Sequence, residues 1–103
     1  MAITPLRLDP YIVDALLPEL AGGDHRPSAF LVYLFLWSRT RARSSLGVAC
    51  SYRDIAAATG LAKRTVQLAV RHLVNRDLIR ARQTGATATP IYSVLTPWRR
   101  RGD

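Results

Sequence analysis

The sequence predicts a mainly α-helical domain with a small β-hairpin near its C-terminal end. Two neighbouring segments, 51–59 and 63–75, repeat apolar residues at the spacing of one helical face. An earlier segment, 28–43, is apolar in almost every direction around a helical axis. After Asp77 the pattern changes to alternating apolar and polar residues, which is typical of strands. With 103 residues, the chain is long enough for one modest core and too short for a second, catalytic or effector-binding domain.

The first helix is expected to begin at Asp9 and Pro10. Aspartate is a favourable N-cap, and proline is well tolerated at the first helical position. The helix is expected to cover 11–17 and to be limited by Pro18, because proline lacks the N–H that a helix interior needs. The pair Gly22-Gly23 then predicts a turn.

Segment 28–43 predicts a second helix, which should begin at Pro27 or Ser28. Because this helix is apolar all round, it must be buried on more than one side. One interpretation is that it packs on the N-terminal helix and on the following helical pair within one chain. The other is that it forms, with the N-terminal helix, a homodimer interface. The arginines at its C-terminal end complement the helix dipole and belong either to a solvated face or to phosphate contacts. They are Arg39, Arg41 and Arg43.

Two short helices joined by a tight turn are predicted between residues 51 and 75. Ser51 and Asp54 have capping-box spacing, so the first of these helices should begin near Tyr52. Gly60 suits the positive φ at which helices often end. From Lys63 onward, one helical face is apolar and the opposite face is available to a partner. The apolar face holds Val66, Ala69, Val70 and Leu73, and the opposite face holds Arg64, Gln67, Leu68, Arg71 and Asn75.

The alternating pattern predicts a hairpin with strands 78–82 and 91–95, joined by the small, polar segment 83–90. Because side chains alternate along a strand, Arg80 and Arg82 should lie on the same exposed side. Either they contact DNA, or they are ordinary solubilising charges.

Positive charge is concentrated in the second part of the chain. The net charge is +8, but residues 1–38 hold two basic and four acidic residues, a net of −2. The remainder holds thirteen basic and three acidic residues, a net of +10. This asymmetry places a positive field on the helical pair and the hairpin, as expected of a phosphate-binding surface.

The segment from Leu46 to Leu95 resembles the winged helix-turn-helix DNA-binding domain family. Small residues allow the two helices to approach closely, a glycine ends the first helix, and a hairpin follows the second. The residues that carry these features are Ile55, Ala56, Gly60, Leu61, Val66, Ala69 and Leu73. The resemblance implies a third short strand at 48–50. The sequence departs from the family at Ala62, which cannot cap the second helix, and at Thr59, where a bulky aliphatic residue is usual.

The expected layout is a single winged-helix domain over residues 1–103, with N-terminal helices at 9–45, the helix-turn-helix at 51–76, the wing at 78–95 and a basic tail at 96–103. In the tail, Trp98 is expected to pack on the domain. Arg99, Arg100 and Arg101 either bind phosphate without sequence preference or belong to a disordered end or to the beginning of a linker.

These features predict sequence-specific binding of double-stranded DNA by a small bacterial or phage transcriptional regulator, with helix 63–75 in the major groove. Arginine and glutamine on that helix would donate to base edges, and Leu68 would touch a thymine methyl group. The other basic residues and Thr65 would hold phosphates and set the register. The full set of expected DNA-binding residues is Arg53, Lys63, Arg64, Thr65, Gln67, Leu68, Arg71, Asn75, Arg80 and Arg82.

Two other functions stay open. The layout also resembles the DNA-binding module of plasmid or phage replication initiators, and winged helices can serve as protein-interaction modules. An enzyme is not expected, because the sequence shows no paired carboxylates, Ser-His-Asp set or phosphate-binding glycine loop.

No metal or cofactor is expected, because Cys50 is the single cysteine and His25 and His72 lie far apart. Cys50 should be a buried thiol. Without a signal-peptide pattern or a long apolar stretch, the sequence predicts a cytoplasmic protein without membrane association.

Overall fold

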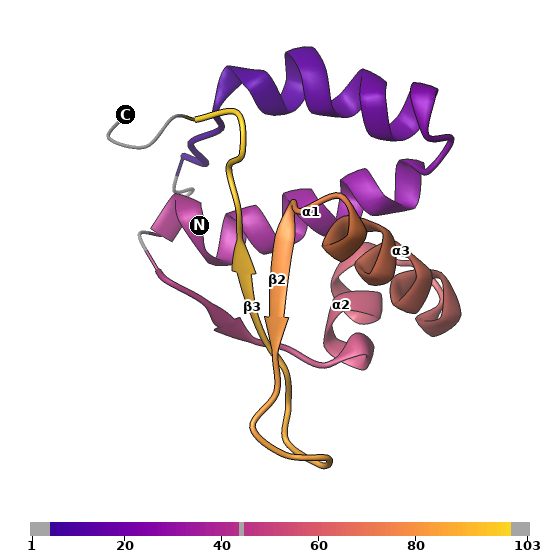
Figure 1. Ribbon diagram of the computed structural model, residues 1–103, viewed down its shortest axis with the longest axis vertical. Coiled ribbons are helices and arrows are strands. Elements are labelled where there is room, and N and C mark those ends of the chain that lie inside the picture. Colours follow the sequence, from indigo (N-terminus) through magenta and orange to yellow (C-terminus); the bar gives the residue numbers. More distant parts are fainter. Residues whose placement is uncertain (1–4, 44, 100–103) are drawn as a thin grey trace.

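The computed structural model describes residues 5–43 and 45–99. It is mostly helical, with a three-stranded antiparallel sheet on one side (Figure 1). The predicted fold class, a mainly α winged helix-turn-helix with a small β-hairpin wing, is confirmed. In chain order the elements are η1 (Ile12–Leu16), η2 (Pro18–Gly23), α1 (Pro27–Arg39), η3 (Arg41–Arg43), β1 (Val48–Ala49), α2 (Tyr52–Thr59), α3 (Lys63–Asn75), β2 (Ile79–Arg82) and β3 (Ile91–Val94).

Helix α1 is the centre of the molecule. It packs against η2 on one side and against α2, α3 and β3 on the others. Its side chains at Val32, Tyr33 and Leu36 have no exposed surface. Packing within one chain therefore accounts for the apolar residues around most of this helix, while Leu31 remains 43% exposed.

The N-terminal helical segment does not stop at Pro18, as the sequence predicted, but continues to Gly23. Its turns are wider than those of an α-helix. The backbone N–H of Leu17 donates to the carbonyl of Ile12, and that of Asp24 donates to the carbonyl of Glu19, each across five residues. Pro18 is the first residue of the second of these wide segments, a position at which proline is tolerated.

The end of α1 also differs from the expected position near Arg43. The α-helix stops at Arg39, and a short 3₁₀ turn follows. Thr40 is buried, its Oγ1 donates to the carbonyl of Leu36 at 2.7 Å, and its backbone leaves the helical region at φ −117° and ψ −82°. Threonine thus competes locally with helix continuation, which the apolar pattern did not indicate.

The sheet has the strand order β1-β3-β2, so the third short strand implied by the family resemblance is present. Tyr92 lies opposite Val48 on one side and opposite Ala81 on the other. At the base of the wing, the side-chain nitrogen of Gln83 donates to the carbonyls of Ala86 and Ala88 at 3.2 and 2.7 Å. The wing loop is therefore closed by its own side chain.

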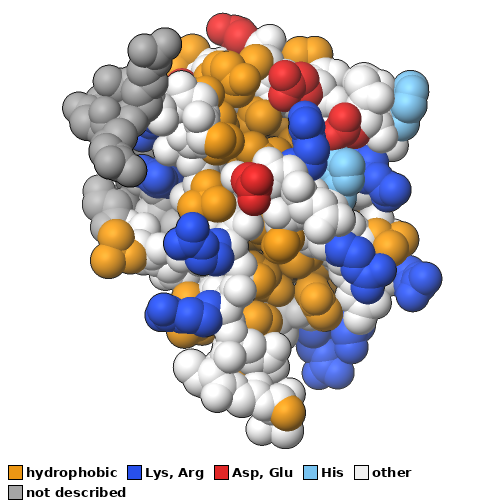
Figure 2. Space-filling model, viewed as in Figure 1, with side chains coloured by type: hydrophobic (Ala, Val, Ile, Leu, Met, Phe, Trp, Pro, Cys, Tyr) orange, Lys and Arg blue, Asp and Glu red, His pale blue; other side chains and the backbone are white. Residues whose placement is uncertain are grey.

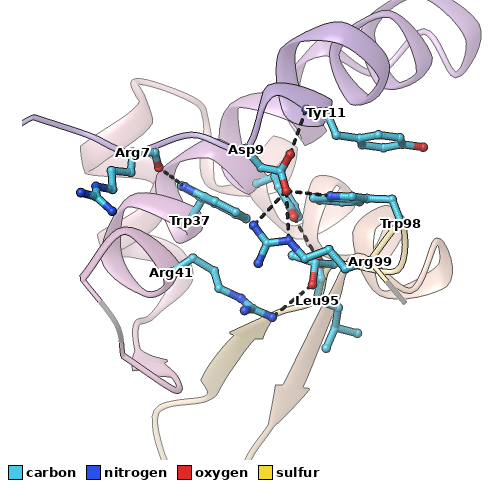
Figure 3. A network of polar contacts seen from close by, with 10 residues as sticks. Arg7, Asp9, Tyr11, Trp37, Arg41, Leu95, Trp98 and Arg99 are labelled. Atoms are coloured by element: carbon cyan, nitrogen blue, oxygen red, sulfur yellow. Dashed lines mark hydrogen bonds and ion pairs between the residues drawn. The ribbon is translucent and has the colours of Figure 1, made fainter. Parts of the chain in front are cut away.

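The two ends of the described chain are held together over α1 (Figure 3). The Asp9 carboxylate accepts a hydrogen bond from the Trp98 indole at 2.9 Å and pairs with Arg99 at 2.9 Å. The hydrogen bond from Trp98 and the neighbouring Arg99 charge lower the pKa of Asp9. Trp98 also stacks on Tyr11, with ring centroids 4.6 Å apart, so its predicted packing on the domain is confirmed. Arg100 and Arg101 lie outside the described residues.

Candidate nucleic-acid interface

Helix α2 begins and ends as the sequence predicted. The Ser51 hydroxyl accepts from the N–H of Asp54, and the Asp54 carboxylate accepts from the N–H of Ser51, both at 3.1 Å. Hydrogen bonds to Ser51 lower the pKa of Asp54, so the cap is charged at neutral pH. Gly60 takes a φ of +78° and turns the chain sharply towards α3. The capping box fixes where α2 begins, and this glycine sets the direction in which the chain leaves α2 towards α3.

Helix α3 is anchored by its apolar face. Val66, Ala69 and Leu73 are buried where α3 meets α1 and α2. Ala62 precedes the helix without a side-chain cap, as expected. The opposite face is presented outward: Arg64, Leu68, Arg71 and Asn75 are exposed and Gln67 is half-buried.

The other flank of α3 is tied to the N-terminal helical layer. His72 Nε2 lies 2.8 Å from the Asp24 carboxylate, and Arg76 pairs with Asp24 at 3.1 Å and with Glu19 at 3.4 Å. The hydrogen bond with His72 lowers the pKa of Asp24, so the carboxylate stays charged. His72 therefore holds α3 in place. Within residues 5–43 and 45–99, no cluster of three or more potential metal-binding side chains occurs.

A hollow of about 620 Å³ lies between the start of α2, the start of α3 and the sheet. It brings together Arg53 from α2, Lys63 from α3 and Arg82 from β2. All three are exposed, and none forms a salt bridge within the described part of the chain. Tyr52 and Tyr92 line the same hollow.

A second hollow, of about 390 Å³, continues along α3. Both hollows are lined by Tyr52, Val70 and Ala81, so they form one groove between α3 and β2. We refer to this feature, with the residues that line the two hollows, as the α3–β2 groove. Its second part also holds Gln67, Arg71, Val74 and Asn75. Figure 2 shows apolar side chains in the lower half of the molecule with basic side chains on both sides of them.

The structure does not bring every expected DNA-binding residue into this groove. Arg80 lies with Arg82 on one side of β2, as predicted, but lines a separate hollow beside Gly47 and Ser93. Arg82 lines this separate hollow and also the larger hollow of the α3–β2 groove. Thr65 is half-buried and lines none of the hollows described for this surface. Arg64 and Leu68 lie on the exposed face of α3, outside the groove.

Sequence reasoning missed the apolar floor of the groove. The sequence marks Tyr52 only as the start of a helix, whereas in the structure it lines both hollows of the groove. Val74 is 38% exposed on α3, and Ala81 faces it from β2. The available signal was Val74 itself, an apolar residue that continues the row of Val70 at a spacing of four towards the predicted strand.

Charge is divided between the two parts of the molecule. In Figure 2, acidic side chains gather near the N-terminal helical layer, and basic side chains dominate around α3 and the wing. Between residues 51 and 95 the chain holds only two acidic residues, Asp54 and Asp77. The surface that carries the outward face of α3 is therefore predominantly positive.

Residues 26–79 match the family model described as a helix-turn-helix domain. This match covers more than half of the 103 residues, and the chain belongs to the helix-turn-helix domain family. Neither the curated proteins nor the solved structures contained a match to the chain. Membership of the family suggests DNA binding, and such domains are typically non-enzymatic. In the described residues, every helix is too short or too polar to cross a bilayer.

Proposed function

We propose that this protein binds double-stranded DNA in a sequence-specific manner and acts as a transcriptional regulator. The observation that carries the proposal is the outward face of α3, which is mostly polar, mostly exposed and packed from behind against α1 and α2. Arg53, Lys63 and Arg82 surround the start of this helix from three different elements. That arrangement supplies both base-reading and phosphate-holding groups.

In this function α3 enters the major groove. Arg64, Gln67 and Arg71 donate to base edges, because arginine suits guanine and glutamine suits adenine. Asn75 extends the same row, and Leu68, which is 37% exposed, meets a thymine methyl group.

Phosphate contacts set the register of α3 in the major groove of the DNA. Arg53, Lys63 and Arg82 are best placed for this role because they converge on one hollow. The expected contributions of Thr65 and Arg80 stay predictions, since both residues lie outside that hollow.

Selection of binding sites from random duplex DNA tests the proposal most directly. We expect enrichment of a defined sequence, with an affinity that falls steeply as salt rises because phosphate contacts release counterions. Binding without sequence preference would contradict base reading by α3. Binding to protein partners that hardly responds to salt would instead indicate an interaction module. Transcriptional regulation and replication initiation share this interface, and the genomic position of the selected site separates them.

A homodimer through α1 and the N-terminal helical segment is part of the proposal. Since most apolar side chains of α1 are buried within one chain, a partner would meet exposed residues such as Val13 and Leu31, which are 47% and 43% exposed. Two-fold symmetry in the selected site would support two copies on DNA. A single asymmetric half-site, bound by a monomer in sedimentation, would contradict it.

A further inference from the structure

We propose that the α3–β2 groove binds a small organic anion with an apolar body, and that this ligand and DNA exclude each other. The mutual exclusion rests on the DNA-binding function proposed above, whereas the ligand site does not. The ligand class follows from three features of the groove: its volume, its cations and its apolar floor.

The volume suits a small molecule. The larger hollow holds about 620 Å³, within the range of about 300–1,000 Å³ that is typical of small-molecule sites. The adjoining hollow of about 390 Å³ shares three of its lining residues. An elongated molecule can therefore lie along the groove, with one end near the start of α3 and the other near Val74.

Three of the four cations that line the groove are gathered at one end, and the fourth, Arg71, lines the other end. Arg53, Lys63 and Arg82 line the larger hollow, and none has an ion-pair partner in residues 5–43 and 45–99. No acidic residue lines either hollow. A carboxylate, sulfonate or phosphate at this end would meet positive charge from three directions.

The floor of the groove is apolar and aromatic. Tyr52 and Tyr92 stand beside Val70, and the floor continues through Ala81 to Val74. Burial raises the pKa of Tyr92, so its hydroxyl keeps its proton. Tyr52, Ala81 and Val74 are the solvent-accessible part of this floor. An apolar body laid on them would release water, and that gain is not offered by a phosphate group alone.

Occupancy by such a ligand would block DNA binding. The ligand head would use the same cations that we assign to DNA phosphates, and its body would lie against Gln67 and Arg71. A molecule that binds one state of a protein shifts the population towards that state, and the ligand would therefore release DNA.

The test uses anilinonaphthalene sulfonate, a fluorescent anion with an apolar body, titrated into the full chain. We expect saturable binding, weakened about two- to fivefold by Arg53→Gln through loss of charge. Val74→Gln should weaken it at least about twofold through loss of apolar contact. Arg7→Gln is the matched control, because Arg7 is exposed beside the chain ends and far from the groove lining, and it should leave the affinity unchanged. Lys63→Gln replaces Arg53→Gln if circular dichroism shows that the latter is unfolded.

Three results would overturn the ligand site: no saturable binding, equal affinity in all variants, or equally tight binding of the neutral analogue phenylnaphthylamine. A selected DNA duplex should displace the bound probe, and simultaneous binding of both would overturn the exclusion. DNA binding is measured separately by anisotropy without the probe. If the protein binds DNA but not the probe, only the ligand site is refuted. If it binds the probe but not DNA, only the proposed function is refuted.

Discussion

Truncation of Arg71 separates base reading from fold stability. Arg71 is exposed on α3, and within the described residues its side chain makes no salt bridge or hydrogen bond. Arg71→Ala should therefore change the free energy of unfolding by no more than about 0.5 kcal/mol. If the guanidinium donates to a guanine, its loss should cost about 1–3 kcal/mol of binding, or about 5- to 150-fold in Kd.

The matched control is Arg76, the residue that directly follows α3. Arg76 carries the same charge, but its guanidinium is engaged by Glu19 and Asp24. Arg76→Ala should reduce stability slightly and should weaken binding equally on the selected and scrambled duplexes, because it removes charge without removing a base contact.

The assay is fluorescence anisotropy with the selected duplex and a scrambled duplex, at one fixed salt concentration. The expected result is a loss of preference in Arg71→Ala and a retained preference in Arg76→Ala. The assignment of α3 as the reading helix is refuted if Arg71→Ala and Arg64→Ala both bind the selected duplex like the parent protein. It is also refuted if Arg76→Ala loses the preference as strongly as Arg71→Ala.

Three further predictions concern the cap, the wing and the acid response. Ser51→Ala removes one half of the α2 capping box and should lower the free energy of unfolding by about 1 kcal/mol in urea denaturation, whereas an unchanged midpoint would show that the cap is dispensable. Arg82→Ala should lower the salt dependence of DNA binding by about one phosphate contact and Arg80→Ala by less, since only Arg82 lines the groove; equal slopes would contradict this placement. The pKa of Asp24 is lowered in the folded protein, so its stabilising effect is present above its unfolded pKa and is lost as pH falls through the folded value. Asp24→Asn should therefore flatten the acid side of a pH–stability profile, and a profile identical to that of the parent would rule this out.

Much of the helix-turn-helix was predictable because its signals are local. Ser51 and Asp54 are three residues apart, and Gly60 directly follows its helix, so short-range hydrogen bonds and one backbone conformation place both ends of α2. The apolar period of α3 likewise indicated its buried face and, by difference, the residues of its outward face. The strand pairing of the wing followed from alternation on both sides of a polar loop.

The predicted ends of two helical segments were wrong because tertiary packing overrode a local rule. Pro18 normally ends a helix, but wide turns with hydrogen bonds across five residues carry the segment to Gly23, where it packs on α1. Thr40 is a polar residue that the sequence does not mark as a helix end. In the structure it is buried, and α1 ends at Arg39, four residues before the expected Arg43.

The sequence by itself determined the order and type of most elements, the outward face of α3 and the positive sign of its surroundings. Each depends on residues within a few positions of one another or on composition. Only the tertiary structure decided which distant side chains meet. Asp9 pairs with Trp98 and Arg99, Asp24 with His72, and Ala81 lies opposite Val74 across a groove. Such pairs are set by the packing of whole elements around α1, and a periodic pattern holds no information about the distance between two faces.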